Sequence, residues 1–338
     1  MRNLKIVSVI LLASCFSACT IKERLYMPGY YVHWLGFKSN SPNRNSAGYS
    51  MNAYDALSLK PIQEMCIPVS ESSEMRCQEG TVIQFPANAF IHQDGSPLRC
   101  SKVCVHAWEF YSLSDIIEAG LTTASSGRMI ITSGMVYVEA TCCGENLKLR
   151  PGKQILVKMP VQEEERKTKL FSGKMKNGIV DWTARGNAAA DDLDAGNSEY
   201  DSSYGVEREM VFEGEYGGAD YIMRSGSLGW INCDRFYEME KKTTLFVKAD
   251  TGRRTCIALI FRGMKSVLPG YYNEAKVAEF SNIPAGEDVT VLAYRVDEKN
   301  KTAIVGTEDI TLGDTKKVYL DMREMTLNDF KTFLTQFN

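Results

Sequence analysis

The sequence predicts a mainly β protein with two β-sandwich-like domains, the second immunoglobulin-like, and a short C-terminal helix. Apolar and polar side chains alternate in many short stretches, which is the period of a strand with one buried face. Turn residues such as Gly, Pro, Asn and Asp separate these stretches. Between residues 226 and 322, seven such stretches follow one another at roughly ten-residue spacing, which is typical of an immunoglobulin-like sandwich.

Residues 1–18 carry the features of a bacterial lipoprotein signal peptide in the expected order. A cationic start precedes an uncharged apolar run at 6–13, which is too short to span a membrane. Small residues then precede Cys15, and again Cys19, in the manner of a lipobox. We therefore expect cleavage before one of these cysteines and its acylation, with more than one acyl chain for stable attachment. The residue directly after each cysteine, Phe16 or Thr20, is not acidic, which favours the outer membrane, and there the periplasmic face is favoured over the cell surface.

Residues 20–60 show neither a helix period nor a strand period, so they predict a flexible tether. Residues 61–160 predict a β-rich domain, in which 113–120 is the one segment that reads as a short helix. Its N-cap is expected at Ser112 or Ser114, with Asp115 beside it. The strands of this domain are expected near 80–86, 103–108, 135–141, 147–149 and 155–160.

Residues 161–225 predict a hairpin at 170–182 and then an acidic linker rich in Ala, Asp, Ser, Gly and Asn. The carboxylates of this linker lack the spacing of an EF-hand calcium loop, so a solvated linker is favoured. Residues 226–322 predict the immunoglobulin-like domain, with strands near 228–233, 243–248, 255–261, 275–280, 288–296, 302–310 and 316–320.

Residues 323–338 predict a C-terminal helix with Thr326 as its N-cap. One face of this helix is apolar, so we expect it to dock on a domain surface or on a partner. The residues of that face are Leu327, Phe330, Phe333, Leu334 and Phe337.

Eight cysteines follow the two anchor candidates, and an even set in an exported protein favours disulfides. Pairing of Cys66 with Cys77 would close a short loop. A second group could form a cross-strand cluster, and this group consists of Cys100, Cys104, Cys142 and Cys143. Cys233 and Cys256 flank an expected hairpin. Unpaired core thiols and a four-thiolate metal site are the alternatives, and the adjacent Cys142 and Cys143 lack the usual zinc-knuckle spacing.

The composition and motifs exclude several classes of function. The formal net charge of −3 provides no basic surface for nucleic acid. No nucleophile elbow, zinc-protease motif or phosphate-binding loop occurs, so we expect no cofactor and no metal. The three histidines show no paired ligand spacing, and Asp115 and Glu118 on the expected helix read as solubilising residues.

Several stretches resemble a β-rich module that recurs in uncharacterised lipoproteins of the Bacteroidota. These stretches lie at 80–90 (beginning Gly-Thr-Val-Ile-Gln-Phe-Pro), 109–116 and 133–140. The first of them is also similar to the opening of the ZU module of ankyrins and netrin receptors, a protein-binding unit. Residues 228–236 resemble the start of the second domain of the same lipoproteins, and residues 26–32 resemble their post-signal segment. The resemblance implies location and fold, and it brings no known activity.

Two hypotheses for function follow. The first is a non-enzymatic envelope module that binds another envelope protein or a glycan. Its candidate contact aromatics are Trp108, Tyr111, Trp182, Trp230, Tyr271 and Tyr272, although β-sandwiches bury aromatic side chains and a core position is favoured for each of them. The second is an envelope hydrolase that acts on a glycan or peptide through a carboxylate pair, which needs a cleft with two carboxyl groups about 5–10 Å apart, expected between the domains.

Overall fold

A computed structural model describes Lys60 and residues 62–160, 169–176, 179–185, 209–213, 219–249, 255–272, 277–297, 300–313 and 316–338. The predicted signal peptide, Cys15, Cys19 and the tether up to residue 59 lie outside these residues, as does most of the acidic linker. Within the described part, the fold is mainly β with several antiparallel sheets and a short C-terminal helix, which confirms the predicted class.

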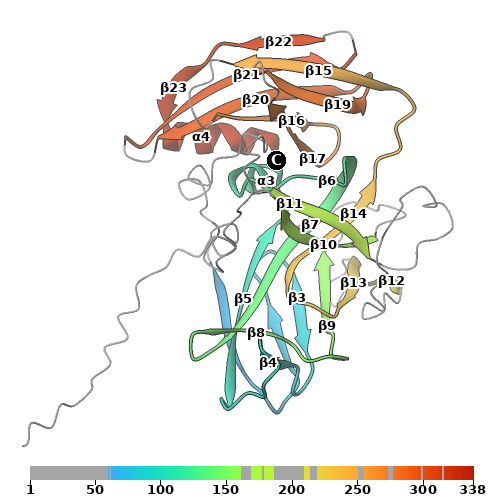
Figure 1. Cartoon of the computed structure of the whole chain (residues 1–338), viewed down its shortest axis with the longest axis vertical. Coiled ribbons are helices and arrows are strands. Elements are labelled where there is room, and N and C mark those ends of the chain that lie inside the picture. Colours follow the sequence, from blue (N-terminus) through green and yellow to red (C-terminus); the bar gives the residue numbers. More distant parts are fainter. Residues whose placement is uncertain are drawn as a thin grey trace, which may run out of the picture.

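The chain forms two units, whose elements follow one another in sequence (Figure 1). The N-terminal unit contains β1 (Gln63–Pro68), β2 (Ser73–Arg76), β3 (Val82–Phe85), β4 (Phe90–His92), β5 (Lys102–Phe110), α3 (Leu113–Glu118), β6 (Ala124–Ser125), β7 (Arg128–Cys142), β8 (Glu145–Leu149), β9 (Ile155–Pro160), β10 (Lys169–Lys176), β11 (Ile179–Arg185), β12 (Glu209–Glu213), β13 (Ala219–Ser225) and β14 (Gly229–Phe236). The C-terminal unit contains β15 (Lys242–Ala249), β16 (Cys256–Phe261), β17 (Ser266–Pro269), β18 (Tyr271–Tyr272), β19 (Ala278–Pro284), β20 (Asp288–Asp297), β21 (Thr302–Thr311), β22 (Lys317–Leu320), β23 (Arg323–Thr326), α4 (Leu327–Leu334) and the 3-10 turn η1 (Thr335–Phe337).

Two sheets form the N-terminal unit and enclose one apolar core. The larger sheet has the order β1-β5-β7-β14-β10-β11, and the smaller has the order β12-β13-β9-β3-β2. The predicted hairpin is confirmed as β10 and β11. The predicted domain boundary at residue 226 is corrected, because β14 pairs with β7 in the first sheet. The predicted linker also contains two strands, β12 and β13, which pair with each other, and β13 pairs with β9.

The C-terminal unit consists of two further sheets around a second core. One has the order β18-β19-β15-β22, in which β15 and β22 run parallel, and the other has the order β17-β16-β20-β21-β23. Apolar residues of β15, β19 and β22 meet those of β16 and β20 in this core. All six residues of β16, Cys-Ile-Ala-Leu-Ile-Phe, are buried. Such a run is typical of a strand that is covered on both faces.

A third core joins the two units. Alternate residues of β16 face opposite ways: Ile257, Leu259 and Phe261 belong to the C-terminal core, whereas Cys256, Ala258 and Ile260 belong to the joint. The joint also contains Trp108, Phe110 and Trp230 of the N-terminal unit. The two units therefore share one continuous apolar core.

Two helices lie between the units (Figure 1). The Ser112 hydroxyl accepts the Asp115 N–H and the Asp115 carboxylate accepts the Ser112 N–H, which forms a capping box at the start of α3. The predicted cap of the tail helix is also confirmed, because the Thr326 hydroxyl accepts the Asp329 N–H at 3.1 Å. The tail docks on the protein itself: Phe330 and Leu334 are fully buried, and the Asn338 side chain accepts the Ser114 N–H at 3.0 Å.

Hydrogen bonds reinforce the joint. The Thr123 N–H donates to the Val267 carbonyl at 2.9 Å, and the Val267 N–H donates back to the Thr123 hydroxyl at 2.8 Å. The link from β14 to β15 is only five residues long, 237–241. Within it, the Tyr237 N–H donates to Met129 in one unit while its hydroxyl donates to Glu287 in the other. These contacts fix the two units against each other.

Candidate functional site

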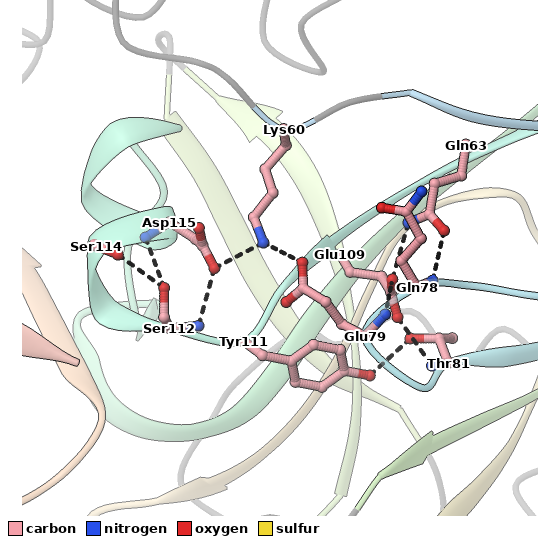
Figure 2. Close-up of polar contacts among 10 residues, drawn as sticks. All are labelled: Lys60, Gln63, Gln78, Glu79, Thr81, Glu109, Tyr111, Ser112, Ser114 and Asp115. Carbon is pink, nitrogen blue, oxygen red and sulfur yellow. Dashed lines mark hydrogen bonds and ion pairs between the residues drawn. The ribbon is translucent and has the colours of Figure 1, made fainter. Parts of the chain in front are cut away.

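A buried carboxylate, Glu109, lies within a cluster of polar side chains in the N-terminal unit (Figure 2). It lies on β5 and is 1 % exposed. Its oxygens accept the N–H groups of Glu79 at 2.8 Å and Thr81 at 2.9 Å, and the side-chain amide of Gln63 at 2.9 Å. Burial of a carboxylate is tolerated when such donors replace its hydration. Glu109 therefore holds the turn before β3 against β5.

Lys60 connects this cluster to α3. Its ammonium group donates to Glu79 and to Asp115, with a distance of 2.9 Å to the latter, and Figure 2 shows it between the two carboxylates. Burial lowers the pKa of Lys60, but the hydrogen bonds and charges of Glu79 and Asp115 outweigh it and raise the pKa overall. Because α3 also binds Asn338, the Lys60 junction ties the first described residue to the C-terminal tail.

Cys77 and Tyr111 lie beside Glu109 and have little nucleophilic character. Burial, helped by the charge of Glu109, raises the pKa of the Cys77 thiol to about 12. Burial also raises the pKa of Tyr111 well above its usual value, and its hydroxyl bonds to Thr81 at 2.8 Å. The thiolate is the reactive form of cysteine, so Cys77 is inert near neutral pH. Gly134 lies against the Tyr111 ring, where an added Cβ would come within 2.3 Å of a ring carbon.

A second row of polar side chains crosses β1, β5 and β7 on the opposite face. The register places Glu64 opposite His106 and His106 opposite Glu139. The His106 ring lies 2.8 Å from Glu64 through Nε2 and 3.4 Å from Glu139 through Nδ1. Burial lowers the pKa of His106, but the two carboxylates outweigh it, so that the pKa is raised overall. The sequence did not indicate this row, because it depends on which residues of neighbouring strands lie opposite one another.

The disulfides join Cys66 to Cys104 and Cys100 to Cys142. The predicted pairing of Cys66 with Cys77 is wrong, because Cys66 lies directly opposite Cys104 across β1 and β5. Cys77, Cys143, Cys233 and Cys256 are thiols. Cys233 and Cys256 lie in different cores, so they do not flank and close a hairpin as predicted.

Most of the candidate contact aromatics are core residues. Trp108, Tyr111, Trp182 and Trp230 are between 0 and 5 % exposed, so a role as surface contacts is ruled out for them. The rings of Trp108, Tyr137 and Trp230 pack edge to face in the joint. The side chains of Tyr271 and Tyr272 lie outside the described part, although their strand pairs with β19.

A pocket of about 380 Å³ opens on the seam between the units. The hairpin of β6 and β7 forms one wall, and β17 and β19 form the other. Met129, Leu268, Phe280 and Ile283 give it apolar surface, while Arg128 and Glu279 give it charge. Glu279 is the one carboxylate among its described lining residues. No spacing in the sequence indicated this pocket, because its walls come from different units.

Comparison with protein-family models, with characterised proteins and with solved structures found no match. Among the residues that the structure describes, no helix has the length and apolar character needed to cross a membrane.

Proposed function

We propose that this chain is a lipid-anchored envelope lipoprotein whose body is a non-enzymatic binding or assembly module for another envelope protein. The observation that carries the proposal is the joint: two β units share one core, and a pocket opens on their seam. A fixed seam presents a preformed surface, so that binding there loses little conformational freedom. The anchor on Cys15 or Cys19 comes from the signal-peptide features of the sequence.

The two disulfides support export. Cys66–Cys104 and Cys100–Cys142 need an oxidising compartment to form and persist, such as the bacterial envelope. The signal-like N-terminus and the disulfides are independent features that favour the same compartment. The outer membrane, on its periplasmic face or at the cell surface, is the proposed address.

The seam pocket is the proposed contact site, and a protein segment is its proposed occupant. Its apolar walls suit aliphatic or aromatic side chains, and Arg128 with Glu279 offers charges of both signs at one opening. Its volume lies within the range of specific ligand pockets. A glycan, the other ligand class considered, is an outcome that the experiment below distinguishes.

Site-specific photo-crosslinking in cells tests the contact. A crosslinker at Ser281, an exposed lining residue, should give a discrete product with an envelope protein. The same crosslinker at Glu308, an exposed residue of β21, is the matched control. The product should disappear when Arg128→Glu is added. A glycan adduct would replace the proposed occupant, and equal products at Ser281 and Glu308 would overturn the contact site.

Membrane fractionation tests the anchor. Cys15→Ser and Cys19→Ser, made separately, should release the protein from membranes in one case only. Retention of both variants in the membrane fraction would refute acylation at these cysteines.

We also infer that the C-terminal unit is immunoglobulin-like in the broad sense of a sandwich of two facing sheets. Residues of both of its sheets meet in its core, which supports this interpretation. Pairing of β16 with β17 in one sheet departs from the constant-type order, in which the second and third strands lie in opposite sheets. Membership of the Bacteroidota lipoprotein family is likewise proposed, on the motifs at 80–90 and 228–236. A crystal structure of the full chain tests the sandwich.

The hydrolase alternative has less support. Glu279 is the one carboxylate among the described lining residues of the seam pocket, whereas glycoside hydrolysis uses two. Glu79 and Asp115 are close together, but both bind Lys60 and serve to hold α3.

A further inference from the structure

Four side chains with metal-binding atoms lie on one face of β1 and β5, and three of them form a compact group. Glu64 lies opposite His106, and two residues along the strands Cys66 lies opposite Cys104. Residues two apart on a strand share a face, and directly opposed residues are its nearest neighbours. The ligand atoms of Glu64, Cys66 and Cys104 all lie within 4.8 Å of one another. The Nε2 atom of His106 is 2.8 Å from the Glu64 carboxylate.

The group also has a neighbouring carboxylate of the kind that orients the ligands in metal sites. A histidine ligand usually donates its other ring N–H to a carboxylate, which fixes the ring. Here Nδ1 of His106 lies 3.4 Å from Glu139, whose side chain is only 12 % exposed. A proton on Nδ1 leaves the lone pair on Nε2, which lies 2.8 Å from the Glu64 carboxylate. Nδ1 of His106 and the second oxygen of Glu139 are both buried without a hydrogen-bond partner, so the ion pair at 3.4 Å is the contact that holds the two side chains together.

We propose that reduction of the Cys66–Cys104 disulfide creates a zinc-type site of two thiolates, the His106 imidazole and the Glu64 carboxylate. This set of sulfur, nitrogen and oxygen ligands is one that Zn²⁺ accepts in tetrahedral geometry. Metal–ligand bonds of about 2.0–2.3 Å give ligand–ligand distances of roughly 3–4 Å, so the two sulfurs must move apart on reduction and the His106 ring must move toward them. Cys66 and Glu64 are exposed, so a cation can reach the site from solvent.

The chemical steps balance with a dithiol as reductant. A thiolate of the dithiol attacks one sulfur of the disulfide, the S–S bond breaks and a mixed disulfide forms. The second thiol of the reductant resolves it, which leaves two cysteine thiols and an oxidised dithiol. The cation then displaces the two thiol protons into solvent and forms two metal–sulfur bonds. Oxidation reverses the process and releases the cation, so the oxidised and metal-bound forms are alternatives.

Titration of the mature chain with Zn²⁺ alone tests the site. The protein is reduced, freed of reductant under inert gas and titrated in a calorimeter. We expect one tightly bound ion per reduced chain, no such binding to the oxidised chain, and with Co²⁺ the absorption of tetrahedral thiolate coordination. Cys66→Ser with Cys104→Ser should abolish this binding. Cys100→Ser with Cys142→Ser, which also removes one disulfide, is the matched control and should keep it.

Further measurements decide the proposal without relying on the folding of one variant. Glu139→Gln keeps all four ligands and should weaken binding by about 10- to 100-fold. In the reduced native chain, Zn²⁺ should protect Cys66 and Cys104 from alkylation while Cys143 still reacts. Equal binding by the Cys66/Cys104 variant and its control would overturn the proposal. So would a reduced native chain that binds no Zn²⁺, or one that unfolds and does not refold with it.

Discussion

Glu109 shows how one side chain can determine a local structure. Three N–H donors converge on its carboxylate inside the N-terminal unit, and all three would lose their acceptor if it were removed. Each such donor is expensive to leave unsatisfied when it is buried. The turn before β3, and with it the Lys60 junction, therefore depends on this residue more than on its apolar neighbours.

Replacement of Glu109 tests this dependence. Glu109→Ala should lower the free energy of unfolding by about 2–5 kcal/mol, because the donors lose a charged, buried acceptor. Glu308→Ala, at an exposed position on β21, should change it by less than about 0.5 kcal/mol. Urea unfolding followed by circular dichroism measures both. Equal effects of the two substitutions would show that the Glu109 hydrogen bonds add nothing to stability.

The cysteine side chains should differ sharply in reactivity. Cys143 is exposed, whereas Cys77 is buried and its thiol pKa is raised to about 12. Brief treatment of the oxidised protein with an alkylating reagent near pH 8 should therefore label Cys143 first, and Cys77 only after unfolding. Peptide mass spectrometry identifies the labelled sites. Early labelling of Cys77 would show that its surroundings open readily in the folded protein.

At the scale of elements, sequence periodicity identified strands better than it identified their partners. The stretches expected near 243–248, 288–296 and 302–310 are strands, and Thr326 caps α4 as expected. Alternation of apolar residues reports that a strand has a buried face, but it carries no information about which sheet the strand joins. For this reason β14 was assigned to the wrong unit.

The same limit applies to the candidate sites. Pairing of Cys66 with Cys104 and the row through His106 depend on the register of β1, β5 and β7, which no local pattern specifies. The aromatic residues offered as contacts could not be separated from core residues, because both uses favour large apolar side chains. Trp108 and Trp230 are buried in the structure, so they are core residues and not surface contacts.

Burial of Glu118 on α3 should make stability depend on pH. Burial raises the pKa of Glu118 to about 7, although the charge of Lys331 partly opposes this. Since the folded-state pKa lies above the unfolded value, the protonated carboxyl stabilises the fold at low pH. That contribution is complete below about pH 4.5 and is lost as the pH rises through about 7.

Glu118→Gln tests this dependence by imitating the protonated carboxyl. Between pH 5 and 8, the free energy of unfolding of this variant should change less than that of the native chain. The difference should be roughly 1–2 kcal/mol after allowance for solvent screening. Thermal unfolding at several pH values measures the difference. Glu240→Gln, in the link between the units, provides a comparison at an exposed position. Parallel curves for Glu118→Gln and the native chain would contradict the assignment.

At the scale of the whole molecule, three cores alternate with sheets. The large N-terminal sheet separates its own core from the joint, and the sheet with β16 and β20 separates the joint from the C-terminal core. Each of these two sheets therefore has apolar side chains packed on both of its faces. Separation of the units would expose the joint to water, at a cost of about 25 cal/mol for each Å² of apolar surface. The two units should consequently fold and unfold together.

Calorimetry of the full chain tests this cooperativity. We expect one thermal transition whose calorimetric and van't Hoff enthalpies agree. The reason is that each unit alone would expose its apolar face of the joint to water. Phe330→Ala, in α4, removes a fully buried ring from the joint and should cost about 3–5 kcal/mol. Its effect should be to shift the whole transition to lower temperature. Phe333→Ala, one turn along the same helix and only partly buried, should cost less. Two separate transitions in the native chain, or a Phe330→Ala transition that splits while one half stays in place, would show that the shared core does not couple the units.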